Sequence, residues 1–113
     1  MATGTIPHSD YQMLSNLLFT ISLSDNTTHT VNSVNDRKIS DYDYLLAVVG
    51  NHSRGTMILP TRIFATKAMY IGFMYAGSLK EVDVTYVSDT SVTITSVQIN
   101  EGINVYGIKV VSV

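Results

Sequence analysis

The chain has 113 residues, of which 14% are charged, with a formal net charge of −2 and no cysteine. This length is typical of one domain with its own core, and the absence of cysteine excludes disulfides and thiolate metal sites. The basic residues are scattered and no apolar run approaches the ~20 residues that span a bilayer. We therefore expect neither a nucleic-acid partner nor membrane insertion, and the N-terminus lacks the pattern of a signal peptide.

Strand patterns occupy most of the first half of the chain. Apolar residues alternate over Leu17–Leu23, and a weaker strand pattern covers Thr30–Val34. The segment Tyr42–Val49 is apolar on both faces, which is typical of a strand that is central in its sheet or buried on both sides. It ends at the polar loop Gly50–Gly55, and the short apolar strand Thr56–Leu59 follows.

The second half continues the same pattern after Thr61–Phe64, which is expected to form a helical turn or a short connection. Further strands are expected over Ala68–Tyr75, Glu81–Val87, Ser91–Ile99 and Val105–Val113. Gly72, inside the first of these, predicts a bulge or a close backbone approach. Within Ser91–Ile99 the apolar residues change from one face of the strand to the other, which predicts a second bulge or a switch between sheets.

About eight strands at spacings of roughly 8–12 residues are the pattern of an all-β antiparallel sandwich or jelly roll. We expect a lead-in segment over residues 1–16 and a sandwich domain over 17–113. A helix over Ser9–Asn16 is compatible with its capping serine and helically spaced apolar residues. The low charge and the apolar end beyond Lys109 predict that neighbouring copies of the chain cover part of its surface.

Motifs for catalysis are missing. The sequence holds no GxSxG, P-loop or GxGxxG motif, and its two glutamates, Glu81 and Glu101, lie at strand ends or turns. The histidines are widely separated and are expected to be exposed loop residues: His8, His29 and His52. We therefore expect a protein without enzymatic activity, metal or cofactor. In a homotrimer, however, a single histidine near the axis would recur three times and could bind a metal without any local motif.

Two groups of polar side chains are candidates for ligand binding. The loop between Gly50 and Gly55 presents donors and acceptors suited to sugar hydroxyls, and its candidate residues are Asn51, His52, Ser53 and Arg54. A solvated hairpin tip is the alternative interpretation of this loop. Tyrosines such as Tyr42 and Tyr44 are the other candidates, because an exposed tyrosine ring can stack against a sugar.

Four segments carry the motifs of a known family. Ile39–Val49 contains S-x-Y-D-x-L followed by hydrophobic residues, and Thr56–Phe64 has an apolar strand pattern with a proline and a later phenylalanine. Tyr86–Val92 has the pattern of a hairpin, and Tyr106–Lys109 that of a closing strand. In these segments the chain resembles the C-terminal domains of phage and prophage tail-fibre proteins, with their penultimate hairpin and their terminal strand I-Y-G-I-K. The resemblance covers most of the chain, roughly Leu17–Lys109.

The resemblance implies a β-sandwich head domain that is trimeric about a fibre axis at the tip of a phage tail fibre or baseplate appendage. Such a domain would bind a bacterial cell-surface glycan or protein and contact other tail or virion proteins. Its location would be the virion tail, after synthesis in the bacterial cytoplasm. The matched residues define the fold and carry no binding residues across. Two alternatives stay open: a structural virion protein for tail assembly or capsid decoration, and an enzyme acting on bacterial polysaccharide through two carboxylates.

Overall fold

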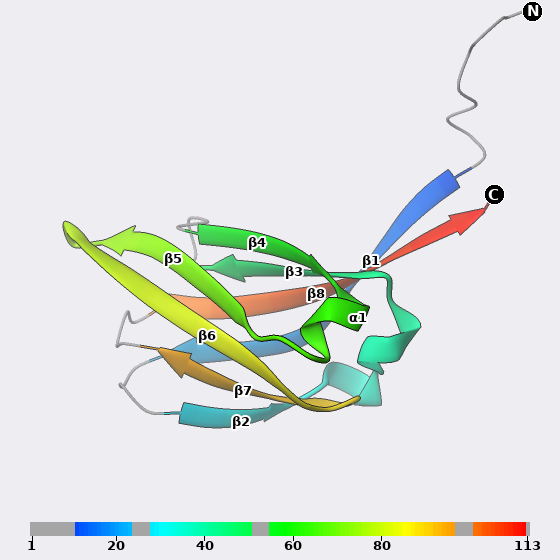
Figure 1. The fold of residues 1–113 in the computed structure, drawn as a ribbon, viewed down its shortest axis with the longest axis horizontal. Coiled ribbons are helices and arrows are strands. Elements are labelled where there is room, and N and C mark those ends of the chain that lie inside the picture. Colours follow the sequence, from blue (N-terminus) through cyan, green and yellow to red (C-terminus); the bar gives the residue numbers. More distant parts are fainter. Residues whose placement is uncertain (1–10, 24–27, 51–54, 97–100, 113) are drawn as a thin grey trace, which may run out of the picture.

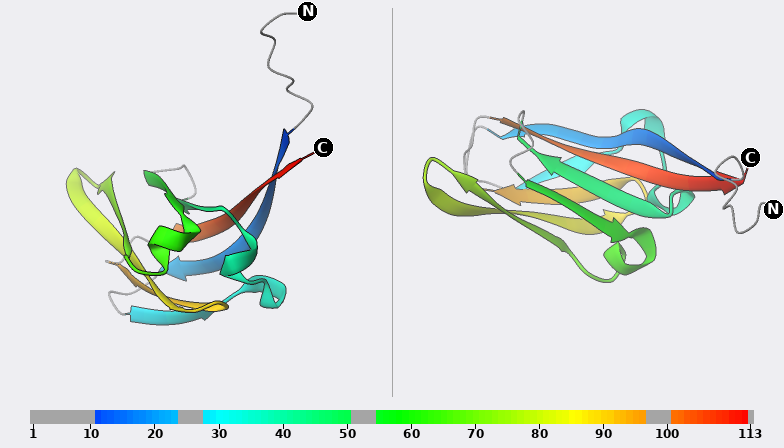
Figure 2. Two further views of the ribbon diagram at one scale, coloured as in Figure 1. Left: turned by 45° about the vertical axis from the view of Figure 1, so that its right-hand side comes forward. Right: turned by 90° about the horizontal axis from the view of Figure 1, so that it is seen from above.

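The computed structural model describes residues 11–23, 28–50, 55–96 and 101–112. These residues form eight strands in two antiparallel four-stranded sheets, which lie face to face as separate layers (Figures 1 and 2). Sheet A has the strand order β1-β8-β3-β4, and sheet B has the order β2-β7-β6-β5. The predicted all-β antiparallel sandwich of about eight strands is confirmed.

The strand bounds follow the predicted alternation closely in the middle of the chain. Sheet A contains β1 (Tyr11–Leu23), β8 (Glu101–Ser112), β3 (Tyr44–Val49) and β4 (Gly55–Pro60). Sheet B contains β2 (Thr28–Asn32), β7 (Ser91–Ser96), β6 (Ser78–Ser88) and β5 (Met69–Tyr75). Two 3-10 turns, Val34–Asp36 and Ile39–Asp41, connect β2 to β3, and the short helix α1 (Thr61–Phe64) connects β4 to β5.

The hydrophobic core lies between the two sheets, where alternate residues of each strand point inward. In β3 these are Leu45, Ala47 and Val49, which are all buried. Phe64 of α1 closes one end of the core, and its ring meets Tyr86 edge to face at a centroid distance of 6.1 Å. The other core residues are Leu18, Phe19, Ile39, Tyr42, Met69, Ile71, Phe73, Val82, Val84, Val92, Ile94, Ile103 and Val105.

The start of the chain departs from expectation. The sequence is compatible with a helix over Ser9–Asn16, but the described part of this segment is a strand, because β1 begins at Tyr11 rather than at Leu17. Residues 11–17 pair one by one with β8, from Tyr11 opposite Ser112 to Leu17 opposite Tyr106. Tertiary pairing with β8 thus overrides the helical spacing, and the first strand reaches into the segment expected to be a lead-in.

The predicted positions of the bulges also need correction. Gly72 pairs regularly opposite Glu81, so it forms no bulge. The alternative, a close backbone approach, is present, because a Cβ built at Gly55 would lie 3.1 Å from the Gly72 carbonyl oxygen. Register shifts occur instead in β1 between Leu17 and Phe19, and in β6 between Tyr86 and Ser88. The segment beyond Ser96, where the apolar face was expected to change, lies outside the described residues.

The two longest strands of sheet A, β1 and β8, extend beyond the rest of the sandwich (Figure 1). The pairing of β8 with β3 ends at Ile108, opposite Tyr44, whereas its pairing with β1 continues to Ser112. We call the remaining two-stranded ribbon, residues 11–14 with 109–112, the terminal arm. Two strands alone are marginally stable in water, so the base of this arm needs support from the sandwich.

Candidate functional site

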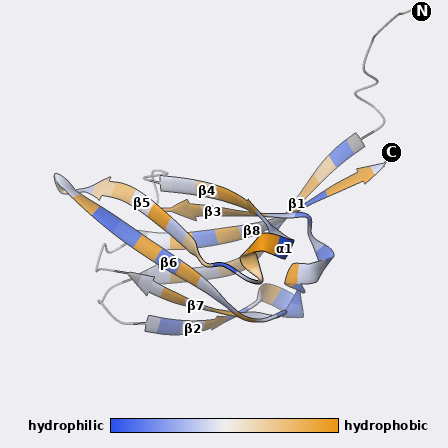
Figure 3. Cartoon of the chain, in the orientation of Figure 1, coloured by the Kyte–Doolittle hydropathy of each residue, from blue (hydrophilic) through white to orange (hydrophobic). Residues whose placement is uncertain are grey.

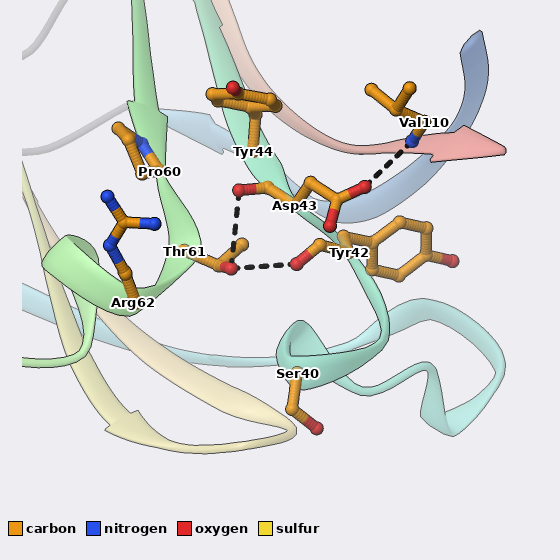
Figure 4. A pocket seen from close by; sticks show the side chains of 8 residues that line it. All are labelled: Ser40, Tyr42, Asp43, Tyr44, Pro60, Thr61, Arg62 and Val110. Atoms are coloured by element: carbon orange, nitrogen blue, oxygen red, sulfur yellow. Dashed lines mark hydrogen bonds between the residues drawn. The ribbon is translucent and has the colours of Figure 1, made fainter. Parts of the chain in front are cut away.

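A pocket of about 660 Å³ lies at the end of the sandwich where β3 begins, β4 ends and the terminal arm leaves sheet A (Figure 4). Its walls come from three segments that are far apart in the sequence. They are formed by Ser40, Tyr42, Asp43, Tyr44, Pro60, Thr61, Arg62 and Val110. Because only the folded chain brings these segments together, no local sequence motif predicts the pocket.

Tyr42 forms the base of the pocket and anchors the terminal arm. Its ring packs on Gly107 of β8 so closely that a Cβ atom built there would lie 2.5 Å from the ring Cγ. The Tyr42 hydroxyl accepts a hydrogen bond of 3.1 Å from the Asn16 side chain, and Asn16 is the residue opposite Gly107. One aromatic side chain therefore holds both strands at the point where the arm begins.

Asp43 terminates the pairing of β3 with β8. Its backbone N–H donates to the Ile108 carbonyl at 2.8 Å, while its side-chain Oδ2 accepts the Val110 N–H at 2.8 Å. The carboxylate thus replaces the carbonyl that a further residue of β3 would supply. This allows β3 to turn away while β8 continues into the arm, and it fixes the carboxylate at the rim of the pocket.

Thr61 joins the end of β4 to the same corner. Pro60 lacks an N–H and ends the strand, and α1 starts at the next residue. The Thr61 backbone N–H donates to the Asp43 carbonyl at 3.0 Å, and its Oγ1 donates to the Tyr42 carbonyl at 2.7 Å. These bonds satisfy the backbone where three segments meet, and they leave the next residue, Arg62, directed outward.

Arg62 and Tyr44 flank Pro60 on one side of the pocket (Figure 4), and the exposed carboxylate of Asp43 also lines it. Within the described residues, the Arg62 side chain has no hydrogen-bond or ion-pair partner and is exposed. Tyr44 is 38% exposed. The Tyr42 ring points away from both of them (Figure 4). The pocket therefore offers an unneutralised guanidinium beside a solvent-facing aromatic ring.

A second, smaller hollow of about 280 Å³ adjoins the pocket and shares Ser40, Thr61 and Arg62 with it. Here Asp89, in the turn between β6 and β7, accepts two hydrogen bonds from Ser40. One comes from its N–H at 2.8 Å and the other from its Oγ at 2.6 Å. This contact joins the turn after β6 to the wall between the hollows, and Arg62 lines both of them.

The binding loop predicted from sequence, Asn51 to Arg54, lies outside the described residues, as do His8 and His52. His29 is half-buried in β2, so the expectation of an exposed loop histidine is wrong for this residue. The two tyrosines singled out from the sequence, Tyr42 and Tyr44, both line the pocket. Sequence reasoning missed Arg62, whose only local signal is its place just after the strand-ending proline.

A pair of carboxylates lies elsewhere, on the outward side of β6. A side-chain hydrogen bond between Glu81 and Asp83, together with the repulsion between their charges, raises the pKa of Glu81. Neither residue lines the pocket. Within the described residues, no group of three or more histidine, aspartate or glutamate side chains could hold a metal ion, and no helix is long and apolar enough to cross a membrane.

Comparisons with known proteins give no match to a family model, to a curated protein or to a solved structure. The function is therefore inferred from the pocket and from the chemistry of its walls.

Proposed function

We propose that this protein is a non-catalytic binding domain of a phage tail fibre or related appendage, which recognises an acidic glycan on the bacterial surface. The observation that carries the proposal is a pocket in which Arg62, without a partner among the described residues, lies on the same side as the exposed ring of Tyr44. A guanidinium donates two parallel hydrogen bonds to a carboxylate or phosphate. A tyrosine ring offers an apolar face on which a sugar ring can lie.

The remaining polar atoms of the pocket support a binding role rather than a chemical one. Asp43 uses its side-chain Oδ2 to hold the Val110 N–H, and Thr61 uses its hydroxyl to bond the Tyr42 carbonyl. These two bonds engage one carboxylate oxygen of Asp43 and the hydroxyl of Thr61 in holding the fold. An open hollow lined by a guanidinium without a partner among the described residues, and by an exposed aromatic ring, suits recognition of a surface polysaccharide.

The tail-fibre setting comes from the segments that resemble that family, of which Ile39–Val49 supplies the strand and turn at the pocket. The rival function is a structural virion component, for which no host ligand exists.

Binding to polysaccharides from bacterial surfaces tests the proposal. We expect the protein to bind acidic polysaccharide and intact cells, and Arg62→Ala to weaken binding by about ten- to a hundredfold. Lys67→Ala removes the same charge from an exposed residue that does not line this pocket, and it should leave binding unchanged. Failure of the wild-type protein to bind any glycan or cell would refute the proposal and favour the structural role. Equal losses in the two variants would show that net charge, and not the pocket, controls binding.

A further inference from the structure

The outward face of sheet A carries no charged residue on any of its four strands. Residues opposite each other in an antiparallel pair share a face, and the register therefore defines this set. Its apolar and aromatic members are Met13, Leu17, Tyr44, Leu46, Val48, Ile58, Pro60, Tyr106, Ile108 and Val110. The members between them are small or uncharged polar residues such as Ser15, Thr20, Thr56 and Asn104. We call this surface the A face.

Several members of the A face present large apolar side chains to solvent. Ile58 at its edge is 53% exposed and Met13 on the arm is 64% exposed. Apolar residues continue outward along the paired ends of β1 and β8 (Figure 3). The apolar character of the A face explains why β3 is apolar on both sides. Its inward residues fill the core, and its outward residues, such as Leu46 and Val48, are half-buried in the A face.

The outward face of sheet B differs because it carries charged side chains. It is rich in threonine, and the carboxylates of Glu81 and Asp83 lie on it. Threonine hydroxyls on neighbouring strands, Thr28 and Thr95, form a hydrogen bond of 2.7 Å on this face. Three large apolar side chains, Tyr70, Met74 and Leu79, are also exposed along its β5 and β6 edge. Both sheets therefore expose apolar side chains, but only the outward face of sheet A is without charge on all four strands.

We propose that the A face is the surface through which copies of this chain associate, with the outward sides of their sheets A packed together. Strands about 4.8 Å apart, with a rise of about 3.3 Å per residue, give the A face a flat projection of roughly 500 Å². The accessible surface of the side chains exceeds that projection. Two such faces reach the roughly 1,000 Å² in total that a specific interface needs.

A second copy fits this face better than a partner of different chemistry does. In a symmetric assembly each residue near the axis meets its own equivalents, so a charged side chain there would face a like charge. The absence of every charge from the A face removes this repulsion. Sheets that pack at about 10 Å interdigitate their side chains as in a domain core, and the apolar outward residues of β3, β4 and β8 supply what such packing requires.

The terminal arm strengthens this assignment. Residues 11–14 and 109–112 form two strands with no third strand beside them, an arrangement that is marginal in water. Met13 and Val110 lie opposite each other on the A-face side of the arm, and both are exposed. A neighbouring copy that covers the A face would also cover this pair. Tyr44 and Val110 belong both to the A face and to the ligand pocket, so a neighbouring copy that covers them would compete with a ligand for the ring of Tyr44.

Sedimentation or light scattering at micromolar concentrations measures this association directly. We expect wild-type protein to have the mass of two or three chains, in moderate and in high salt alike, because the interface is apolar. Ile58→Asp places a charge on the A face and should raise the dissociation constant about a hundredfold or more. Met74→Asp is the matched control: Met74 is 58% exposed on the edge strand β5 of sheet B, and this variant should associate normally.

Circular dichroism of both variants checks that they fold, since each changes an exposed residue. A monomeric wild-type protein at these concentrations would overturn the proposal. Equal dissociation of both variants, or normal association of Ile58→Asp, would do the same.

Thiol labelling provides a second measurement. The natural chain has no cysteine, so Ile58→Cys and Met74→Cys each introduce a single reactive group. The thiol at position 58 should be protected from a maleimide reagent at high protein concentration and react on dilution. The thiol at position 74 should react equally at both concentrations. Concentration-independent labelling at position 58 would contradict the proposal.

Discussion

The contact between Tyr42 and Gly107 yields the sharpest stability prediction. In Gly107→Ala the new Cβ would lie 2.5 Å from Cγ of the Tyr42 ring and 2.7 Å from both Cδ atoms. Carbon atoms pack best at about 3.5–4.0 Å, so the ring must move by roughly 1 Å. Overpacking of this kind costs about 1–3 kcal/mol. Because alanine is favoured over glycine in a strand by about 0.5–1 kcal/mol, we expect a net loss of about 1–2 kcal/mol.

Two further variants separate the clash from the intrinsic preference of the strand. Gly72→Ala is the matched control, since the nearest atom to a Cβ built in β5 is the Lys80 carbonyl at 4.0 Å; it should stabilise the protein by about 0.5 kcal/mol. In a Tyr42→Ala background the obstructing ring is gone. Gly107→Ala should then become stabilising, so that its effect reverses sign.

Urea unfolding followed by far-ultraviolet circular dichroism measures these differences at a fixed protein concentration. For a domain of this size, the loss in Gly107→Ala corresponds to a fall of about 4–8 °C in the melting temperature. A neutral Gly107→Ala, or the same loss with and without the Tyr42 ring, would show that the ring does not pack on Gly107 at the base of the arm.

Two other contacts yield predictions. Asp89→Ala removes both hydrogen bonds to Ser40 and should destabilise the protein by about 1–2 kcal/mol in urea unfolding, whereas an unchanged midpoint would mean that this exposed contact contributes nothing. The raised pKa of Glu81 means that the folded chain holds a proton there at a pH where the unfolded chain has lost it. Repulsion from Asp83 therefore lowers stability at neutral pH and is relieved as the pH falls, so Glu81→Gln should stabilise the protein at neutral pH and lose this advantage near pH ~4. A gain that is independent of pH would contradict the repulsion.

The sequence predicts the β-sandwich because a strand leaves a local record: side chains alternate with a period of two. The apolar pattern on both sides of β3 indicated a central strand, which the order β8-β3-β4 bears out. The turn signal at Ala76 and Gly77 is also local, and both residues adopt the positive φ of a tight hairpin turn, 52° and 79°. Pro60 ends β4, as expected for a residue that cannot donate to a strand ladder.

What the sequence could not specify was which distant residues meet. Gly72 and Gly107 look alike as strand glycines, yet only Gly107 lies under an aromatic ring, which comes from a residue far away in the chain. The residues before Leu17 have helical spacing, yet they form a strand paired with β8. Backbone pairing over a whole strand outweighs a weak local preference for helix.

The candidate site depends still more on tertiary structure. Its walls are assembled from the start of β3, the end of β4 and the outgoing part of β8, so Arg62 and Tyr44 become neighbours only after both sheets have formed. The amino-acid composition alone shows that few residues of the chain are charged. The register of sheet A decided where charge is absent, since only strand pairing determines which uncharged residues share one continuous face.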